Sequence, residues 1–173
     1  MNTKTVNTSG DLYVLTIPDV PGNDLIGLAD IAKGIICESW HIGATLPMQL
    51  DMANSERTAG RVQMSDMMIR KMSDLSTCKL WQACTDGKSF AEVRLRVGRT
   101  GASDYTALME WVMTHAMISS IRTIGSGEGG LPIDEFKISF TSLVMTYSQQ
   151  GLDAAVLGGT EFNYDLAKYG PVS

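Results

Sequence analysis

The stretch Phe90-Ala-Glu-Val-Arg-Leu-Arg-Val97 alternates apolar and charged residues more regularly than any other part of this chain of 173 residues. Val93, Leu95 and Val97 occupy every second position, and Glu92, Arg94 and Arg96 occupy the alternate positions. This alternation is typical of a β-strand with one face in the core and the other in water. We therefore expect a strand here, within a sheet that has one solvated face.

Further segments are predicted as strands because apolar and β-branched residues recur within them and turn residues bound them. They are Asp11–Ile17, Gly34–Ile42, Arg61–Arg70, Tyr105–Ile124 as one long or two short strands, Phe136–Tyr147, and residues 162–166. In Phe136–Tyr147 the apolar positions change parity near Thr141-Ser142, which predicts a β-bulge at a barrel corner. A turn is expected at Gly98–Ser103.

Only residues 73–85 change to a helical period, with apolar residues at i, i+3 and i+4 from Leu80. Ser76 is the expected N-cap, and Asp86-Gly87 is expected to end the helix. Seven to nine strands and one helix predict a mainly β fold. We expect an antiparallel sandwich or small barrel with one short flanking α-helix.

Composition limits the domain count and the classes of partner. The length predicts a single domain spanning residues 1–173. The chain has 14 Lys and Arg against 19 Asp and Glu without a basic cluster, which argues against a nucleic-acid partner. No run of about 18 apolar residues is present, so no membrane insertion is expected. The first ten residues are polar and lack the apolar centre of a signal peptide.

Residues 51–61 are the best candidate for a partner-binding element. They are polar and aperiodic, and they predict a loop of about ten residues, a length that in a compact domain is usually functional or mobile. In the strand Gly34–Ile42, alternation predicts that Trp40 faces the core, whereas Ser39 and His41 face away from it.

The chemistry-bearing residues do not predict an enzyme. Cys37, Cys78 and Cys84 are expected to be small buried side chains in a reducing compartment. No CxxC pair is present, and neither a metal nor a cofactor is predicted. The two histidines have no nucleophile at a spacing that indicates catalysis. The methionines between residues 48 and 72 are expected to fill the core, with an adaptable contact surface as the alternative.

The order of these segments resembles the haemolysin-coregulated protein (Hcp) family, the tube-forming proteins of bacterial type VI secretion. The resemblance covers most of the chain after residue 34. It is carried by Trp40 in an early strand and by five further pieces: Ala59-Gly60-Arg61-Val62, the helical segment 74–88, the strand Phe90–Val97, the doublet Ser119-Ser120 within Tyr105–Ile121, and Phe162-Asn-Tyr-Asp-Leu166.

The resemblance implies a small antiparallel β-barrel of two sheets with one short flanking α-helix, and a structural function. Six copies of a family member close into a ring, and rings stack into a hollow tube. A contractile sheath propels the tube, a trimeric spike tips it, and effector proteins travel in its lumen. These proteins and further copies of the chain are the implied partners. The implied location is the bacterial cytoplasm before assembly, followed by secretion without a cleaved signal peptide.

The resemblance also implies contact residues. In the family, the extended loop before the central strand reaches the next ring or subunit; here the candidates are Met52, Asn54, Glu56, Arg57 and Arg61. Ser39 is the candidate lumen-facing position, and an ordinary exposed strand serine is the alternative. The alternative function is a monomeric β-barrel that binds a small apolar ligand, and oligomeric state separates the two functions.

Overall fold

The computed structural model describes residues 11–23, 33–51, 56–100, 105–127, 129–150 and 156–168, and this part of the chain forms thirteen strands and one helix. The helix is α1 (Ser76–Thr85). The strands are β1 (Asp11–Thr16), β2 (Ile35–Cys37), β3 (Ser39–His41), β4 (Ala44–Thr45), β5 (Met48–Asp51), β6 (Glu56–Ala59), β7 (Gln63–Met64), β8 (Met67–Met72), β9 (Ser89–Thr100), β10 (Tyr105–Ile124), β11 (Ile133–Ser139), β12 (Ser142–Gln150) and β13 (Val156–Asp165).

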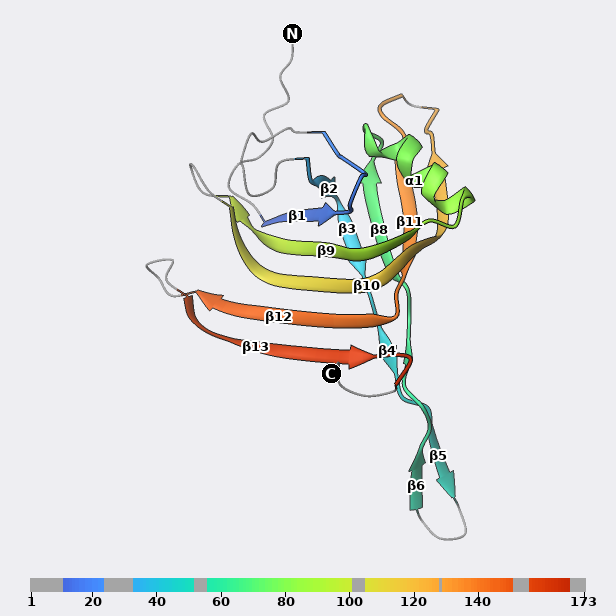
Figure 1. Ribbon diagram of the computed structural model, residues 1–173, viewed down its shortest axis with the longest axis vertical. Helices are drawn as coiled ribbons and strands as arrows, with labels where there is room; N and C mark the ends of the chain where they lie inside the picture. The colour runs from blue at the N-terminus through green and yellow to red at the C-terminus, as the bar shows by residue number, and fades with distance from the viewer. Residues whose placement is uncertain are drawn as a thin grey trace.

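Strand β10 organises the sheet because it pairs along both edges. One edge pairs with β9 from Tyr105↔Thr100 to Met117↔Ser89. The other edge is shared: β12 pairs with residues 109–114, and β11 pairs with residues 117–124. The resulting nine-stranded sheet has the order β2-β1-β9-β10-β11-β8-β3, with β12 and then β13 branching from β10 (Figure 1).

The sheet turns a corner in the middle of β10. His115 is exposed there and has a φ of 47°, a left-handed backbone conformation. Beside it the chain passes from β11 to β12, and the peptide N–H of Thr141 donates to the carbonyl of Thr114 at 3.0 Å. The prediction of one bulged strand over Phe136–Tyr147 is therefore wrong, although its parity switch marks the corner. The two strands separate because β11 also pairs with β8, whereas β12 pairs with β13.

The main core lies between two layers of this one sheet, and a smaller cluster is formed by Val14 and Tyr105. One layer contributes Leu95, Met113 and Leu143, and the other contributes Ile69 and Phe136, all of them buried. The predicted fold class is confirmed as mainly β, antiparallel and flanked by one helix. The two expected sheets are one sheet folded over, and no pairing among the described strands closes it into a barrel.

The segment Gly34–Ile42, predicted as one strand, bends at Glu38 into β2 and β3. The peptide N–H of Glu38 donates to the carbonyl of Arg70 at 2.8 Å. Strand β2 pairs with β1, whereas β3 pairs with β8, so the chain changes layers at this bend. The bend shifts the alternation, and Cys37 and Trp40 consequently both pack against the core. The predicted strand Arg61–Arg70 is divided in the same way, into β7 and β8.

Strand β9 runs to Thr100, so the turn predicted over Gly98–Ser103 starts too early, and its last three residues lie outside the described ranges. Strand β10 approaches β9 very closely at this glycine. A Cβ on Gly98 would lie 2.2 Å from the carbonyl oxygen of Thr106 and 2.9 Å from the Cα of Ala107. The register between the two strands shifts between Ala107 and Met109, which is the irregularity that a glycine inside a strand often marks.

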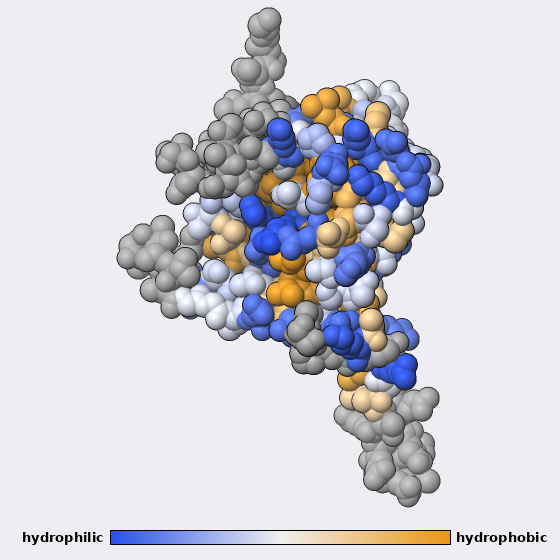
Figure 2. Space-filling view, in the orientation of Figure 1, coloured by the Kyte–Doolittle hydropathy of each residue, from blue (hydrophilic) through white to orange (hydrophobic). Residues whose placement is uncertain are grey.

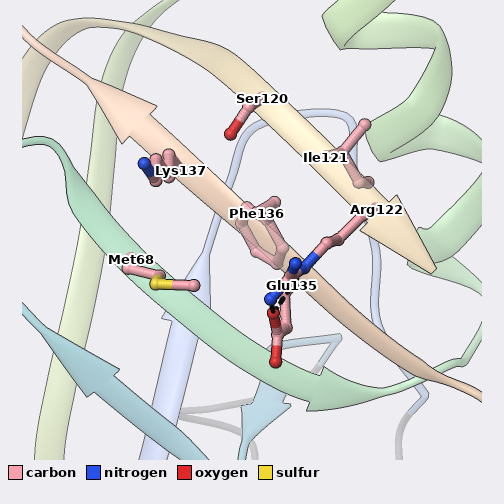
Figure 3. A pocket seen from close by; sticks show the side chains of 7 residues that line it. All are labelled: Met68, Ser120, Ile121, Arg122, Glu135, Phe136 and Lys137. Carbon is pink, nitrogen blue, oxygen red and sulfur yellow. Dashed lines mark hydrogen bonds and ion pairs between the residues drawn. The ribbon is translucent and has the colours of Figure 1, made fainter. Parts of the chain in front are cut away.

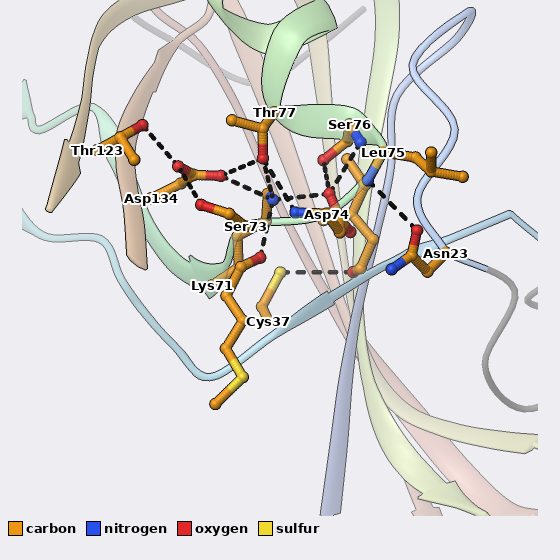
Figure 4. A network of polar contacts seen from close by, with 12 residues as sticks. Asn23, Cys37, Lys71, Ser73, Asp74, Leu75, Ser76, Thr77, Thr123 and Asp134 are labelled. Atoms are coloured by element: carbon orange, nitrogen blue, oxygen red, sulfur yellow. Dashed lines mark hydrogen bonds and ion pairs between the residues drawn. The ribbon is translucent and has the colours of Figure 1, made fainter. Parts of the chain in front are cut away.

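A buried polar network attaches the start of α1 to the sheet (Figure 4). Lys71 of β8 and Asp134 of β11 are fully buried, and the Nζ of Lys71 lies 3.0 Å from Oδ2 of Asp134. The same Nζ lies 2.8 Å from Oδ1 of Asp74, which also accepts the peptide N–H of Ser76 at 2.8 Å. The prediction of Ser76 as the N-cap is wrong, because the N-cap is Leu75 and Ser76 is the first residue of the helix.

Asp134 makes the stability of the fold sensitive to acid. Burial by itself raises the pKa of this carboxyl, but hydrogen bonds from Thr77, Thr123 and Lys71 outweigh it and hold the pKa below the ordinary value of 3.8. The pKa of Asp134 is lower in the folded than in the unfolded state. The ionised carboxylate therefore stabilises the fold fully above about pH 4, and this stabilisation is lost as the pH falls through the folded pKa. We expect the Tm, followed by circular dichroism, to fall more steeply below about pH 4 in the wild type than in Asp134→Asn. Parallel Tm curves for the two proteins would contradict this expectation.

Candidate functional site

An antiparallel arm, residues 44–64, extends from the body at the end opposite α1 (Figure 1). Next to the body β4 pairs with β7, and farther out β5 pairs with β6 from Met48↔Ala59 to Asp51↔Glu56. Each pair forms a separate two-stranded ribbon outside the nine-stranded sheet. The arm therefore depends on the pairing of its own four strands for its shape.

Three hydrogen bonds hold the arm together, two at its base and one between the two ribbons. At the base, the peptide N–H of Gly43 donates to Oγ of Ser65 at 2.9 Å, and the N–H of Ser65 donates to the carbonyl of Gly43 at 2.8 Å. Between the ribbons, the N–H of Gly60 donates to the carbonyl of Pro47 at 2.7 Å. Pro47 has no N–H to offer, which explains why the ladder is interrupted at this point.

The arm presents apolar side chains and open strand edges to solvent. Leu46 is 43% exposed and Met48 is 59% exposed. An isolated two-stranded ribbon is marginally stable in water, and an open strand edge is a template for pairing with another chain. The arm is therefore a surface suited to contact with a second protein.

The loop predicted over residues 51–61 is wrong in its secondary structure, because β6 lies within it and pairs with β5. Alternation did not reveal this hairpin. A ribbon that stands clear of the core needs no apolar side, so its sequence carries no two-residue period.

Of the five residues predicted to contact another copy, three lie in the described part of the arm. Glu56 and Arg57 lie in β6, and Arg61 follows β6 and is exposed. Met52 and Asn54 lie outside the described residues.

Ser39 is exposed on β3, as predicted, and His41 is exposed on the same face. Trp40 between them packs inward, with its ring centroid 5.6 Å from that of Trp111. A hollow of about 190 Å³ opens beside Ser39 and His41, and its lining includes Met68.

A second hollow, of about 310 Å³, adjoins the first across β8, β11 and β10 (Figure 3). The two hollows share Met68 and Glu135 in their linings, so we call them together the groove. Within the groove, Nε of Arg122 donates to Oε2 of Glu135 at 2.6 Å. Lys137 comes from the same strand as Glu135 and lies apart from this ion pair (Figure 3).

The Arg-Leu-Arg segment of β9 is the solvated face of a strand, as predicted. Leu95 is fully buried, and the flanking arginines bind Glu110 of β10 at 3.3 Å from Arg94 and 3.0 Å from Arg96. Figure 2 shows hydrophilic side chains gathered over β9 on this face.

The three cysteines differ in burial, so the expectation that all are buried is wrong. Cys37 is buried, and burial raises the pKa of its thiol to about 12, which keeps it unreactive. Cys84 is half-buried and Cys78 is exposed on α1. Within the described ranges, no group of three or more His, Cys, Asp or Glu side chains is arranged to hold a metal ion. No helix in those same ranges is long and apolar enough to span a bilayer.

The methionine-rich stretch fills the core only in part, contrary to the prediction. Met67 is fully buried, whereas Met48 and Met72 are 59% and 47% exposed. Met68 is half-buried because β8 alternates its side chains between the core and the groove.

Comparison with known proteins agrees with this architecture. A family profile described as "Type VI secretion system effector, Hcp" matches residues 15–147, which is more than half of the chain. "Protein hcp1" of Pseudomonas aeruginosa is 28% identical over 99 residues, which cover 57% of this chain. The match spans 61% of the length of that relative.

Solved structures share the fold at low sequence identity. A "type six secretion system protein" has a TM-score of 0.84 at 19% identity, over 94% of this chain and 100% of the other. Hcp1 from Salmonella typhimurium has a TM-score of 0.74 at 16% identity, over 94% of this chain and 99% of the other. These structural likenesses establish the fold, and the match over residues 15–147 establishes that the chain belongs to the Hcp family of type VI secretion system proteins.

Proposed function

We propose that this chain is the structural subunit of a type VI secretion tube. Six copies close into a ring, the rings stack into a hollow tube, and effector proteins are carried or sheltered in the lumen. The observation that supports this most directly is the arm, an exposed hairpin that leaves the body on the side away from α1 (Figure 1).

The physics of the arm fits an assembly of identical copies. A head-to-tail interface closes into a ring when its rotation fits, and a second contact at the ends of the subunit stacks rings. The arm reaches well beyond the body, so it is placed to make the second kind of contact. Each chain carries a net charge of −5, and like-charged rings should therefore stack more readily as salt screens their repulsion.

The remaining partners in this proposal follow from the same role. The contractile sheath surrounds the tube, the trimeric spike caps it, and the subunit is secreted with the tube. Ser39 lies on the surface that we assign to the lumen. The role is structural and requires no catalytic residue, cofactor or metal.

Light scattering behind a sizing column tests this proposal. We expect the wild type to elute with a mass near six times the chain mass of 18.7 kDa. The double variant Glu56→Ala, Arg57→Ala should keep this mass, because the arm stands clear of the body, and should lose stacked rings at high salt in electron micrographs. A variant that no longer forms the ring would place the arm within the ring interface. A wild type that is monomeric at every concentration would contradict the tube function and favour the alternative, a monomeric β-barrel that binds a small apolar ligand.

A further inference from the structure

The groove crosses the outward face of four neighbouring strands, β3, β8, β11 and the second half of β10. Ser39 and His41 stand at one end of it, on β3. Lys137 and Arg122 stand in the other hollow, on β11 and β10. The hollows measure about 190 and 310 Å³ and open to solvent on the same face, because residues two apart on a strand share a face. An extended chain that crosses the strands could contact both hollows at once.

The charged groups of the groove are mainly cationic in a protein that is acidic overall. Its lining contains Arg70, Arg122 and Lys137 against one carboxylate, Glu135, whereas the whole chain has a net charge of −5. Arg122 is already paired with Glu135, and Arg70 lies 3.5 Å from the rim carboxylate of Glu38. In the described part of the chain, no carboxylate lies within ion-pair distance of Lys137.

The two ion pairs differ in exposure. The side chains of Arg70 and Glu38 are 47% and 37% exposed, and such an exposed pair contributes little to stability, so Arg70 is available to a second carboxylate. The side chain of Arg122 is 67% exposed, but that of Glu135 is only 11% exposed, so Arg122 keeps this pair and offers an added carboxylate the nitrogen that does not bind Glu135, Nη1. A guanidinium also presents a planar fork that matches a carboxylate with two hydrogen bonds.

The floor between these cations is apolar. Met68 lines both hollows, whereas the side chain of Ile121, at the edge of the larger one, points away from the cations and packs against the core (Figure 3). A methionine thioether adapts its shape to different apolar side chains. The groove therefore combines cationic walls with a compliant apolar floor.

We propose that the groove binds an acidic segment of a partner protein, with its carboxylates on Lys137, Arg70 and Arg122 and an apolar side chain on Met68. Charge complementarity selects this occupant over a basic or neutral one. The inference rests on the proposed function in assigning the partner: on a lumen-facing surface, the occupant is a carried effector. Recognition by charge and one apolar contact imposes few demands on the sequence, so cargo proteins of unrelated sequence can share the groove.

Fluorescence anisotropy with two labelled peptides tests the inference on the full chain. One peptide consists of Asp and Glu around a central Leu, and the other replaces every acid by Lys. We expect the acidic peptide to bind at low salt and to weaken as salt is added, since the contacts are exposed. The Lys peptide should not bind.

Variants locate the binding. Lys137→Glu should lower the affinity for the acidic peptide at least about tenfold. Lys137→Gln introduces no repulsion, so it should lower that affinity less. Lys79→Glu makes the same charge change on the exposed surface of α1 and should leave the affinity unchanged. An equal loss in Lys79→Glu, or equal binding of the Lys peptide, would overturn the inference. A neutral Leu peptide that binds as tightly as the acidic one would overturn it as well.

Light scattering on the same samples separates this inference from the proposed function. If rings of six chains form but do not bind the acidic peptide, the groove assignment is overturned and the proposed tube function is unaffected. If the protein is monomeric but binds the peptide through Lys137, the proposed tube function is contradicted and the binding of acidic segments in the groove is supported. Binding by dilute monomers that is lost in rings would mark the groove as an interface between copies, and would overturn its assignment to cargo.

Discussion

Replacement of Asp134 by alanine is expected to lower the free energy of unfolding by about 3–5 kcal/mol, because it removes one of the two carboxylates that pair with the buried ammonium of Lys71. The ammonium of Lys71 is fully buried and binds Asp134, Asp74 and the carbonyl of Met72. The variant also leaves the hydroxyl of Thr77 without its carboxylate acceptor. For a domain of this length the loss corresponds to a decrease in Tm of roughly 10 °C.

A matched control separates burial from charge. Lys88→Ala removes an ion pair with Asp19 whose side chains are 46% and 80% exposed. Such exposed pairs contribute about 0–1 kcal/mol, so the Tm of this variant should stay close to that of the wild type. If Asp134→Ala melts together with Lys88→Ala in a calorimetric scan, the network does not hold α1 to the sheet.

Replacement of Gly98 by alanine is expected to destabilise the fold by at least about 3 kcal/mol, at the upper end of what overpacking costs. The added methyl would meet the backbone of β10 at 2.2 Å, and backbone cannot turn aside as a flexible side chain can. Strands β9 and β10 would have to separate where they form the centre of the sheet. Urea unfolding should show a lower midpoint with an unchanged slope.

Gly125→Ala is the control for this change, since an added Cβ there meets no atom within 4 Å. Its free energy of unfolding should lie within about 0.5 kcal/mol of the wild type. A soluble Gly98→Ala protein with the urea midpoint of Gly125→Ala would show that β9 and β10 do not approach as described.

Local alternation was enough to identify most strands and the direction of several side chains. The β9 segment from Phe90 places Leu95 in the core and its arginines in water because a strand turns successive side chains to opposite faces. The same rule placed Trp40 inward and Ser39 outward. The helix was found from its different period, and Gly87, with a φ of 61°, ends it as expected.

The pairing of those strands was decided by contacts between residues far apart in the chain. The Lys71–Asp134 pair joins residues 63 positions apart, and no local pattern indicates that two charged side chains will share one buried site. The sequence of β10 likewise does not indicate that two strands, β11 and β12, share one of its edges. This division depends on β8 and β13, with which β11 and β12 pair on their other sides.

The candidate site divides in the same way. The sequence by itself determined that residues 51–61 are polar and aperiodic, which predicts a partner-binding element, and that Ser39 faces away from the core. Only the tertiary structure showed that the first of these regions is part of a paired arm, and that Ser39 opens into a groove with Lys137 and Arg122. The physical reason is that periodicity reports only which side of an element is apolar, whereas a binding surface is made by neighbours that the folding of the sheet brings together.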